Sequence, residues 1–262
     1  MFEKEIKSFK KNGYSILRNA IPKNEIRQMF RDFSYVFDIS LRSLGIKTNA
    51  KSCDKKYEIL KKSNLILKSH CYDVLGMLDK VQEITNNEKI LKFSKSISSS
   101  PLCKQSVQIR IDDPSNDRML PLHQELELLS LLGVAIWIPL VDTNSQIGGL
   151  RVVPGSHKMG VKKHLTRDQT KDGYNKVIWN EDKNKIKHLS VKKGDVVVFH
   201  PLLFHGSMPN KSKNARWTLV YRLCDIKFMP YLRSEKAKMF MDRNPDVKSP
   251  GNEFLSKFLK ND

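Results

Sequence analysis

The chain has 262 residues, of which 39% are hydrophobic and 29% charged, and its formal net charge is +19. This length can bury one sizeable core, so we predict a single domain over residues 1–262. No apolar run reaches the roughly eighteen residues of a membrane span, and the charged N-terminus is unlike a secretory signal, so we expect a soluble, cytoplasmic protein without membrane partners. The four cysteines lack a C-x-x-C spacing, which indicates free thiols rather than a zinc knuckle or a redox pair.

The positive charge is carried mostly by lysines spread along the whole chain. A nucleic-acid-binding protein would gather such charge in a patch or a recognisable module, and the sequence shows neither. We therefore expect no dedicated nucleic-acid function. A positive field around a cleft would instead favour a small-molecule substrate that is anionic.

The first part of the chain, about residues 1–100, has helical periodicity. Apolar residues at helical spacing predict a helix over residues 22–44, with Pro22 in its first turn and Gly45 as its stop. Two further helices are expected over residues 55–67 and 71–84.

From Val107 onward, short apolar runs alternate with Gly, Pro, Asn and Asp, which is typical of a β-barrel or sandwich. We expect this β-rich core over about residues 101–228. The run at residues 196–206 is interpreted as a buried strand and its exit, and residues 208–214 as a polar reversal before another extended segment.

Two segments fall outside this pattern. The polar segment 158–193 is interpreted as a long insertion that covers the mouth of a site. Residues 229–262 are expected to form a tail, with a helix near residues 233–241.

A pair of metal-ligating residue types lies in the β-rich part. In an extended strand, His123 and Glu125 project to the same side and can bind one ion, while Gln124 points away. His205, at the end of the later apolar run, is the candidate third ligand. Two imidazoles and one carboxylate can occupy one face of an octahedral Fe(II) and leave the opposite face open.

A candidate anion anchor follows the third ligand. If the segments on either side of residues 208–214 pair as an antiparallel hairpin, Arg216 falls beside His205. Its guanidinium could then hold a carboxylate through two parallel hydrogen bonds. Arg222 is a competing anchor, but it lies farther from His205 in such a hairpin.

With these residues the chain resembles the phytanoyl-CoA dioxygenase family of Fe(II)- and 2-oxoglutarate-dependent oxygenases. The resemblance extends from about Phe9 to Arg222. The matching segments are residues 9–18, 21–25, 121–125, 148–157, 194–207 and 210–216.

The resemblance implies a fold, cofactors and site residues. The fold is mainly β with flanking α: a double-stranded β-helix, or jelly-roll barrel of the cupin type, buttressed by N-terminal helices. The implied cofactors are Fe(II), the co-substrate 2-oxoglutarate and O2, and the implied reaction hydroxylates a C–H bond and releases succinate and CO2. The iron ligands and catalytic residues would be His123, Glu125 and His205. Arg216 would bind the distal carboxylate of 2-oxoglutarate, with further contacts from Gln108, Trp137 and Ser207.

One position departs from the family pattern. The family usually has Asp where this chain has Glu125, which keeps the charge but adds a methylene; Glu127 is a spare carboxylate nearby. Related halogenases have Gly or Ala there, so a retained carboxylate favours hydroxylation. Halogenation, desaturation or epimerisation in the same pocket, and a non-catalytic binding or regulatory member of the fold, stay open as alternatives.

The other histidines have structural interpretations. His157 is expected to fix its loop by hydrogen bonding, and His200 to pack beside its strand. We expect the remaining ones, in polar surroundings, to be solvated: His70, His164 and His188.

Overall fold

The computed structural model describes residues 2–98, 101–115, 118–125, 133–165, 167–171, 173–180 and 182–225. The expected tail with its helix near residues 233–241, and the spare carboxylate Glu127, lie outside these residues. The description below is confined to the described part of the chain.

Helices dominate the first hundred residues, as the periodicity indicates. In chain order they are α1 (Glu3–Asn12), α2 (Lys23–Ser43), α3 (Cys53–Ser63), α4 (Leu65–Leu75), α5 (Asp79–Thr85) and α6 (Glu88–Ser96). The helix predicted over residues 22–44 is confirmed as α2. It buries an apolar stripe that includes Met29, Phe33 and Phe37.

The helix boundaries predicted over residues 55–84 are wrong. The helical conformation is interrupted at Asn64. Its extended backbone ends α3, and its side chain accepts a hydrogen bond from the Leu67 N–H at the start of α4. Asn caps helices well because its short side chain can satisfy a free backbone N–H. A second break follows Leu75, so the segment from 71 to 84 belongs to two helices, α4 and α5.

The strands of the β-rich part are mostly short. They are β1 (Tyr14–Leu17), β2 (Leu102–Asp112), β3 (Leu120–His123), β4 (Gly133–Pro139), β5 (Leu150–Val152), β6 (His164–Leu165), β7 (Lys176–Val177), β8 (Lys187–His188), β9 (Val196–Phe199), β10 (His205–Ser207) and β11 (Arg216–Asp225). Single 3-10 turns lie at Ser156–Met159, Arg167–Gln169 and Lys183–Lys185.

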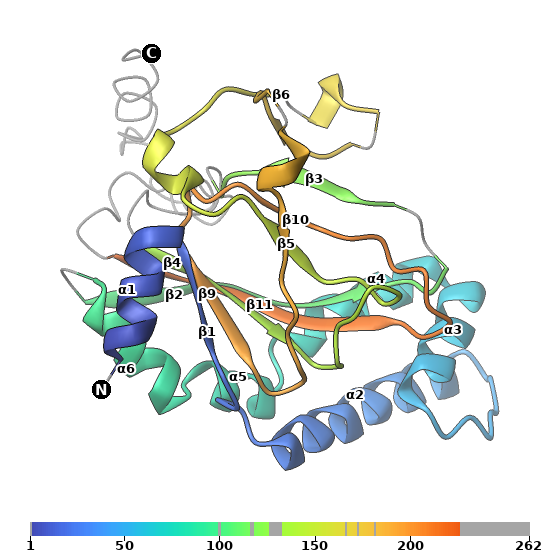
Figure 1. The fold of residues 1–262 in the computed structure, drawn as a ribbon. Helices are drawn as coiled ribbons and strands as arrows, with labels where there is room; N and C mark the ends of the chain where they lie inside the picture. The colour runs from blue at the N-terminus through green and yellow to red at the C-terminus, as the bar shows by residue number, and fades with distance from the viewer. Residues whose placement is uncertain are drawn as a thin grey trace, which may run out of the picture.

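Nine of these strands form two sheets that lie as layers against each other (Figure 1), and β6 pairs with β7 in a separate two-stranded sheet. The larger sheet has the order β1-β9-β4-β11-β2, and the smaller has the order β3-β10-β5-β8. Antiparallel sheets in two layers confirm the expected jelly-roll class. Among the described residues the two sheets share no paired strand, so the jelly-roll is an open sandwich and not a closed barrel.

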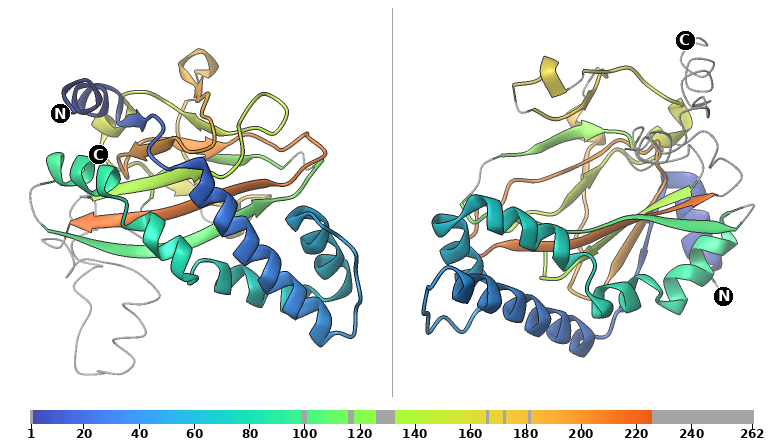
Figure 2. Two further views of the ribbon diagram at one scale, coloured as in Figure 1. Left: turned by 90° about the horizontal axis from the view of Figure 1, so that it is seen from below. Right: turned by 180° about the vertical axis from the view of Figure 1, so that it is seen from behind.

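The N-terminal helices cover the outer face of the larger sheet, with α2 crossing its strands (Figure 2). Trp217 of β11 is fully buried there and stacks on Phe33 of α2, with ring centroids 5.7 Å apart. Because side chains alternate along a strand, the residues on either side of Trp217 point to the opposite face. Arg216 and Arg222 therefore share the face of β11 that is turned toward the smaller sheet.

The 196–206 run does not form one strand. β9 ends at Phe199 in the larger sheet, and after a turn β10 begins at His205 in the smaller sheet. β10 pairs with β3 and β5, whereas β11 pairs with β2 and β4, so the hairpin expected around residues 208–214 is wrong. Local apolar patterns predict strands but not their partners.

His200, in the turn between β9 and β10, packs beside His157 of the 3-10 turn Ser156–Met159. The ring centroids of His157 and His200 lie 5.2 Å apart. His200 Nδ1 accepts a hydrogen bond from the Leu202 N–H at 3.1 Å, whereas Nδ1 of His157 is buried without a hydrogen-bond partner among the described residues. Burial, and after it the charge of His157, lowers the pKa of His200 from 6.5 to about 4.

We expect this histidine to make folding sensitive to acid. Between about pH 6.5 and pH 4 the unfolded chain binds a proton at His200 that the folded chain does not, so the free energy of unfolding falls as the pH falls. The loss from this group is roughly 3 kcal/mol. Urea unfolding at pH 7 and at pH 4.5 measures it. The variant His200→Gln should reduce the pH dependence, and an unchanged dependence would contradict the assignment.

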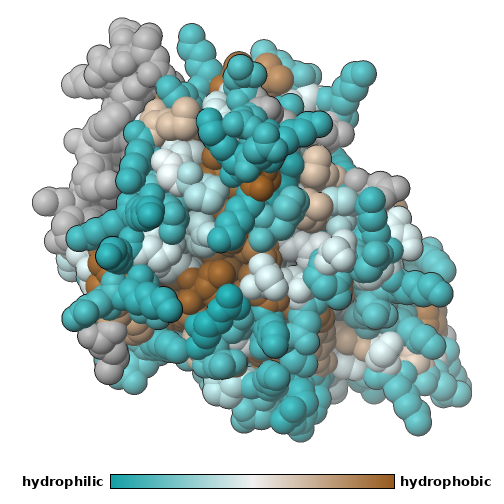
Figure 3. All heavy atoms as spheres, in the orientation of Figure 1, coloured by the Kyte–Doolittle hydropathy of each residue, from teal (hydrophilic) through white to brown (hydrophobic). Residues whose placement is uncertain are grey.

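On the face shown in Figure 3, hydrophilic residues cover most of the surface, and hydrophobic ones show mainly in a hollow near its centre. This face of the protein is therefore mainly hydrophilic. In the described part of the chain, no helix is both long and apolar enough to span a bilayer.

Candidate metal and co-substrate site

Two histidines meet where β3 and β10 run side by side. His123 is the last residue of β3, and His205, the first residue of β10, is its direct antiparallel partner. Their ring centroids lie 4.2 Å apart. Gly206 permits this close pairing, since a Cβ there would lie 2.5 Å from the carbonyl oxygen of Leu120.

Backbone carbonyls orient both imidazoles. Nδ1 of His123 is hydrogen bonded to the Pro121 carbonyl at 3.0 Å, and Nδ1 of His205 to the Leu203 carbonyl at 2.9 Å. Since a carbonyl only accepts, each Nδ1 carries the hydrogen, and each Nε2 keeps a free lone pair. This is the usual arrangement of metal-binding histidines. Burial, and then the neighbouring His205, lowers the pKa of His123 to about 3, which keeps its ring neutral.

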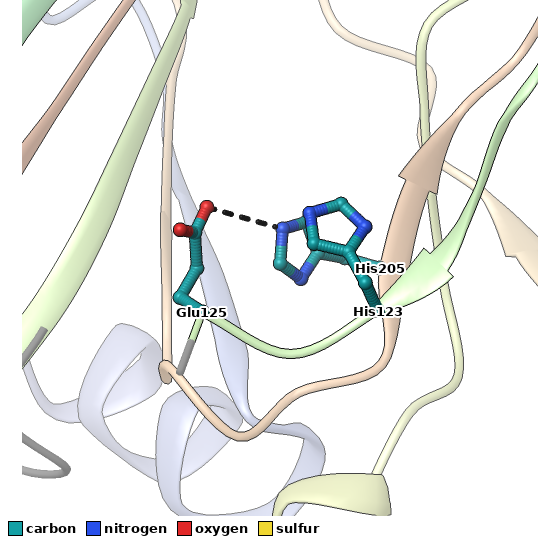
Figure 4. Close-up of side chains that lie close together, drawn as sticks. All are labelled: His123, Glu125 and His205. Carbon is teal, nitrogen blue, oxygen red and sulfur yellow. Dashed lines mark ion pairs between the residues drawn. The ribbon is translucent and has the colours of Figure 1, made fainter. Parts of the chain in front are cut away.

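Glu125 completes the cluster from a position just beyond the end of β3 and not, as expected, within the strand. Its backbone N–H donates to the Pro201 carbonyl at 2.9 Å, which ties it to the turn that precedes β10. The carboxylate faces the two rings (Figure 4), and Oε1 lies 3.4 Å from Nε2 of His205. One donor atom from each of His123, Glu125 and His205 lies within 4.8 Å of the others.

The carboxylate of Glu125 is buried and charged. Burial alone would raise its pKa, but the charge of Arg222 outweighs burial and holds the pKa well below its ordinary value. Nη2 of Arg222 donates to both carboxylate oxygens, at 2.9 and 3.1 Å. An ionised carboxylate is the form that binds a metal.

Gln124 points away from the cluster, as the alternation predicts, and anchors the segment 158–193. Its side-chain amide donates to the Gly160 and Leu202 carbonyls, and its carbonyl accepts from the Lys162 N–H. The backbone N–H of Gln124 donates to Nε2 of His164. The expectation that His164 is solvated is therefore wrong.

The cluster of His123, Glu125 and His205 opens into a cavity of about 220 Å³ between the sheets. The predicted contact residues Gln108, Trp137 and Ser207 all line it. Tyr174 and Asn175 also line it, and they come from the segment interpreted as an insertion over the mouth. This placement agrees with that interpretation.

Arg216 lies in an adjoining cavity and is absent from the described lining of the first. The two cavities share Arg110, Leu120, Tyr174 and Ser207. Arg216 is buried, and Asp112 opposite it on β2 accepts from Nε at 3.1 Å and from Nη2 at 3.0 Å. Nη1 donates to two carbonyls, those of Ile147 and Met208, which leaves one of the five N–H donors for another partner.

Arg222, which the sequence analysis gave only as a competing anchor, lies at the candidate metal site itself. It lines the same cavity as His123 and His205 and is hydrogen bonded to Glu125, although Arg222 and Glu125 are 97 residues apart in the chain. Its even spacing from Arg216 on one strand was a usable signal, because both must face the same way. Arg110 of β2 lines the cavity as well and was not anticipated.

The cluster has the chemistry of a facial metal triad. Two imidazoles and one carboxylate suit Fe(II) or a similar divalent ion, which would keep coordination positions for other ligands. Ligands at right angles around such an ion lie about 3 Å apart, so small side-chain rotations would bring all three donors into range.

Comparison with known proteins identifies the protein family. The sequence profile of the phytanoyl-CoA dioxygenase (PhyH) family matches residues 9–218. The chain belongs to this family. The peroxisomal phytanoyl-CoA dioxygenase of Homo sapiens is 27% identical over 221 residues, which cover 80% of this chain. The chain spans only 64% of the length of that relative.

Solved structures of the family's fold superpose well. A non-heme monooxygenase, ThoJ, matches with a TM-score of 0.62 at 18% identity, covering 83% of this chain and 75% of its own. The epimerase SnoN, solved with Fe3+, alpha ketoglutarate and nogalamycin RO, matches with a TM-score of 0.60 at 14% identity, covering 86% and 83%. At these identities the likeness shows the jelly-roll fold.

Proposed function

We propose that the protein is an Fe(II)- and 2-oxoglutarate-dependent dioxygenase that hydroxylates an unactivated C–H bond of a small molecule. The observation that carries this is the convergence of His123, Glu125 and His205 at the end of a cavity, within 4.8 Å of one another. Family membership supports it independently.

The residues fit Fe(II). Both histidines present Nε2 because their Nδ1 atoms are tied to carbonyls, and Glu125 is ionised. Bound there, Fe(II) would supply the activation of O2, which converts 2-oxoglutarate to succinate and CO2 and inserts one oxygen atom into the substrate.

The protein's own part is to hold and orient. Arg216 would pair with the distal carboxylate of 2-oxoglutarate, with Ser207 between the two cavities as a hydrogen-bond donor along the way. Trp137 and Phe199 give the cavity apolar walls, which limit the approach of water. No side chain needs to act as an acid, a base or a nucleophile.

We expect the protein, supplied with Fe(II), 2-oxoglutarate and O2, to form succinate slowly even without a prime substrate. The variant Glu125→Ala should form at least about ten-fold less, because the metal loses its anionic ligand. Succinate measured by mass spectrometry, with bound iron measured on the same samples, tests this. A wild-type protein that takes up iron poorly and makes no succinate would favour a non-catalytic member of the fold, in which Arg222 simply neutralises Glu125.

A further inference from the structure

Arg222 holds more hydrogen-bonding capacity than its neighbours use. Its residue exposure is 9%, and only Nη2 has a partner, the carboxylate of Glu125. Nε and Nη1 are buried without a hydrogen-bond partner among the described residues. Buried donors are almost always paired, so these two nitrogens indicate a ligand that the protein receives.

The cavity around Arg222 is positively charged. Of the described residues that line it, the charged ones are Arg110, Arg222 and Glu125. Arg110 has a weak contact of its own, 3.5 Å from Nη2 to Oδ1 of Asp112. One carboxylate therefore faces two guanidinium groups.

The metal and the co-substrate leave this excess in place. A divalent cation and the dianion of 2-oxoglutarate cancel each other. Arg216, the proposed anchor of 2-oxoglutarate, lies in the adjoining cavity. Because it is positively charged itself, it does not reduce the positive charge around Arg222. A positive site of low water content attracts an anion strongly, because the interaction is little screened.

We propose that Arg222, assisted by Arg110, forms an anion subsite beside the metal cluster, and that the prime substrate carries a carboxylate which binds there. This inference rests on the proposed function. The acid group then fixes which C–H bond of the substrate faces the metal.

A matched acid and amide test the subsite. The protein is loaded with Ni(II) in place of Fe(II) and saturated with 2-oxoglutarate, and butanoate or butanamide is titrated in by calorimetry. We expect butanoate to bind at least about ten-fold more tightly, since its charge pairs with Arg222. Arg222→Gln should abolish this preference, and Arg222→Lys should retain part of it. Equal binding of the two compounds by the wild type would overturn the subsite.

Two further variants keep the test decisive. Arg110→Gln does not touch Glu125 and should weaken the preference, so it serves if Arg222→Gln fails to fold or to hold metal. Arg18→Gln removes the same charge at an exposed position paired with Asp195 and should leave the preference unchanged. An equal loss in Arg18→Gln would show a general charge effect and contradict the proposal.

Binding of Ni(II) and of 2-oxoglutarate, measured first on every variant, separates this inference from the proposed function. A wild type that binds neither would count against the oxygenase assignment itself. A wild type that binds both but does not distinguish acid from amide would count against the subsite alone. Tight binding of inorganic phosphate with no preference for butanoate would overturn the assignment to a carboxylate.

Discussion

Replacing His205 by alanine is expected to lower the affinity for Fe(II) or Ni(II) by about 100-fold or more. Loss of a hydrogen bond to a metal ligand already costs about 10- to 100-fold, and this variant removes the ligand itself. His205 is 4% exposed, and its Nε2 faces Oε1 of Glu125 at 3.4 Å. Equilibrium dialysis under anaerobic conditions, with metal analysis of the protein, measures the change.

His200→Gln is the matched control for the metal site. This residue lies five positions earlier in the same turn region, but its Nδ1 accepts from the Leu202 N–H and its ring packs near His157 and not near Glu125. We expect the control to bind metal as the wild type does at pH 7. If His205→Ala bound metal as tightly as the control, the three residues would not form the metal site.

Replacing Arg216 by glutamine is expected to weaken the binding of 2-oxoglutarate by about 10- to 100-fold, because a charge-assisted contact to the distal carboxylate is lost. The comparison ligand is 2-oxopentanoate, which has the same chain length without that carboxylate. The wild type should prefer 2-oxoglutarate over it, and Arg216→Gln should bind the two alike. Calorimetric titration of the Ni(II)-loaded protein gives both affinities.

The ion pair of Arg216 with Asp112 supplies the control. If Arg216 were only structural, Asp112→Asn would lower stability much as Arg216→Gln does, and neither would change the preference between the two acids. If Arg216 holds the co-substrate, Asp112→Asn should preserve the preference, because the guanidinium is still present. A preference that disappears in Arg222→Gln but survives in Arg216→Gln would move the anchor to Arg222.

The local parts of this architecture were predictable from the sequence. The apolar stripe of α2 and the alternation around His123 both depend on residues a few positions apart, and such patterns follow directly from helix and strand geometry. The break at Asn64 was missed because the apolar periodicity continues through it, whereas one capping side chain decides where the helix ends.

The long-range parts were harder. Nothing local in residues 196–206 shows that the chain leaves one sheet after Phe199 and enters the other at His205. The hairpin predicted around residues 208–214 was wrong for this reason, whereas the proposal of His205 as a ligand depends on its residue type and the family resemblance and not on that hairpin. The pair of Glu125 and Arg222 joins distant positions, and its importance depends on burial that only the folded chain reveals.

The two layers of the sandwich contribute different halves of the site. His123 and His205 belong to the smaller sheet, whereas Arg216 and Arg222 project from β11 of the larger one. A molecule that chelated the metal at one end and reached Arg216 at the other would cross-link the layers noncovalently. Metal and co-substrate bound at the same time would then hold the two sheets together. The melting temperature of the protein with both ligands should therefore exceed its melting temperature with the metal alone or with the co-substrate alone.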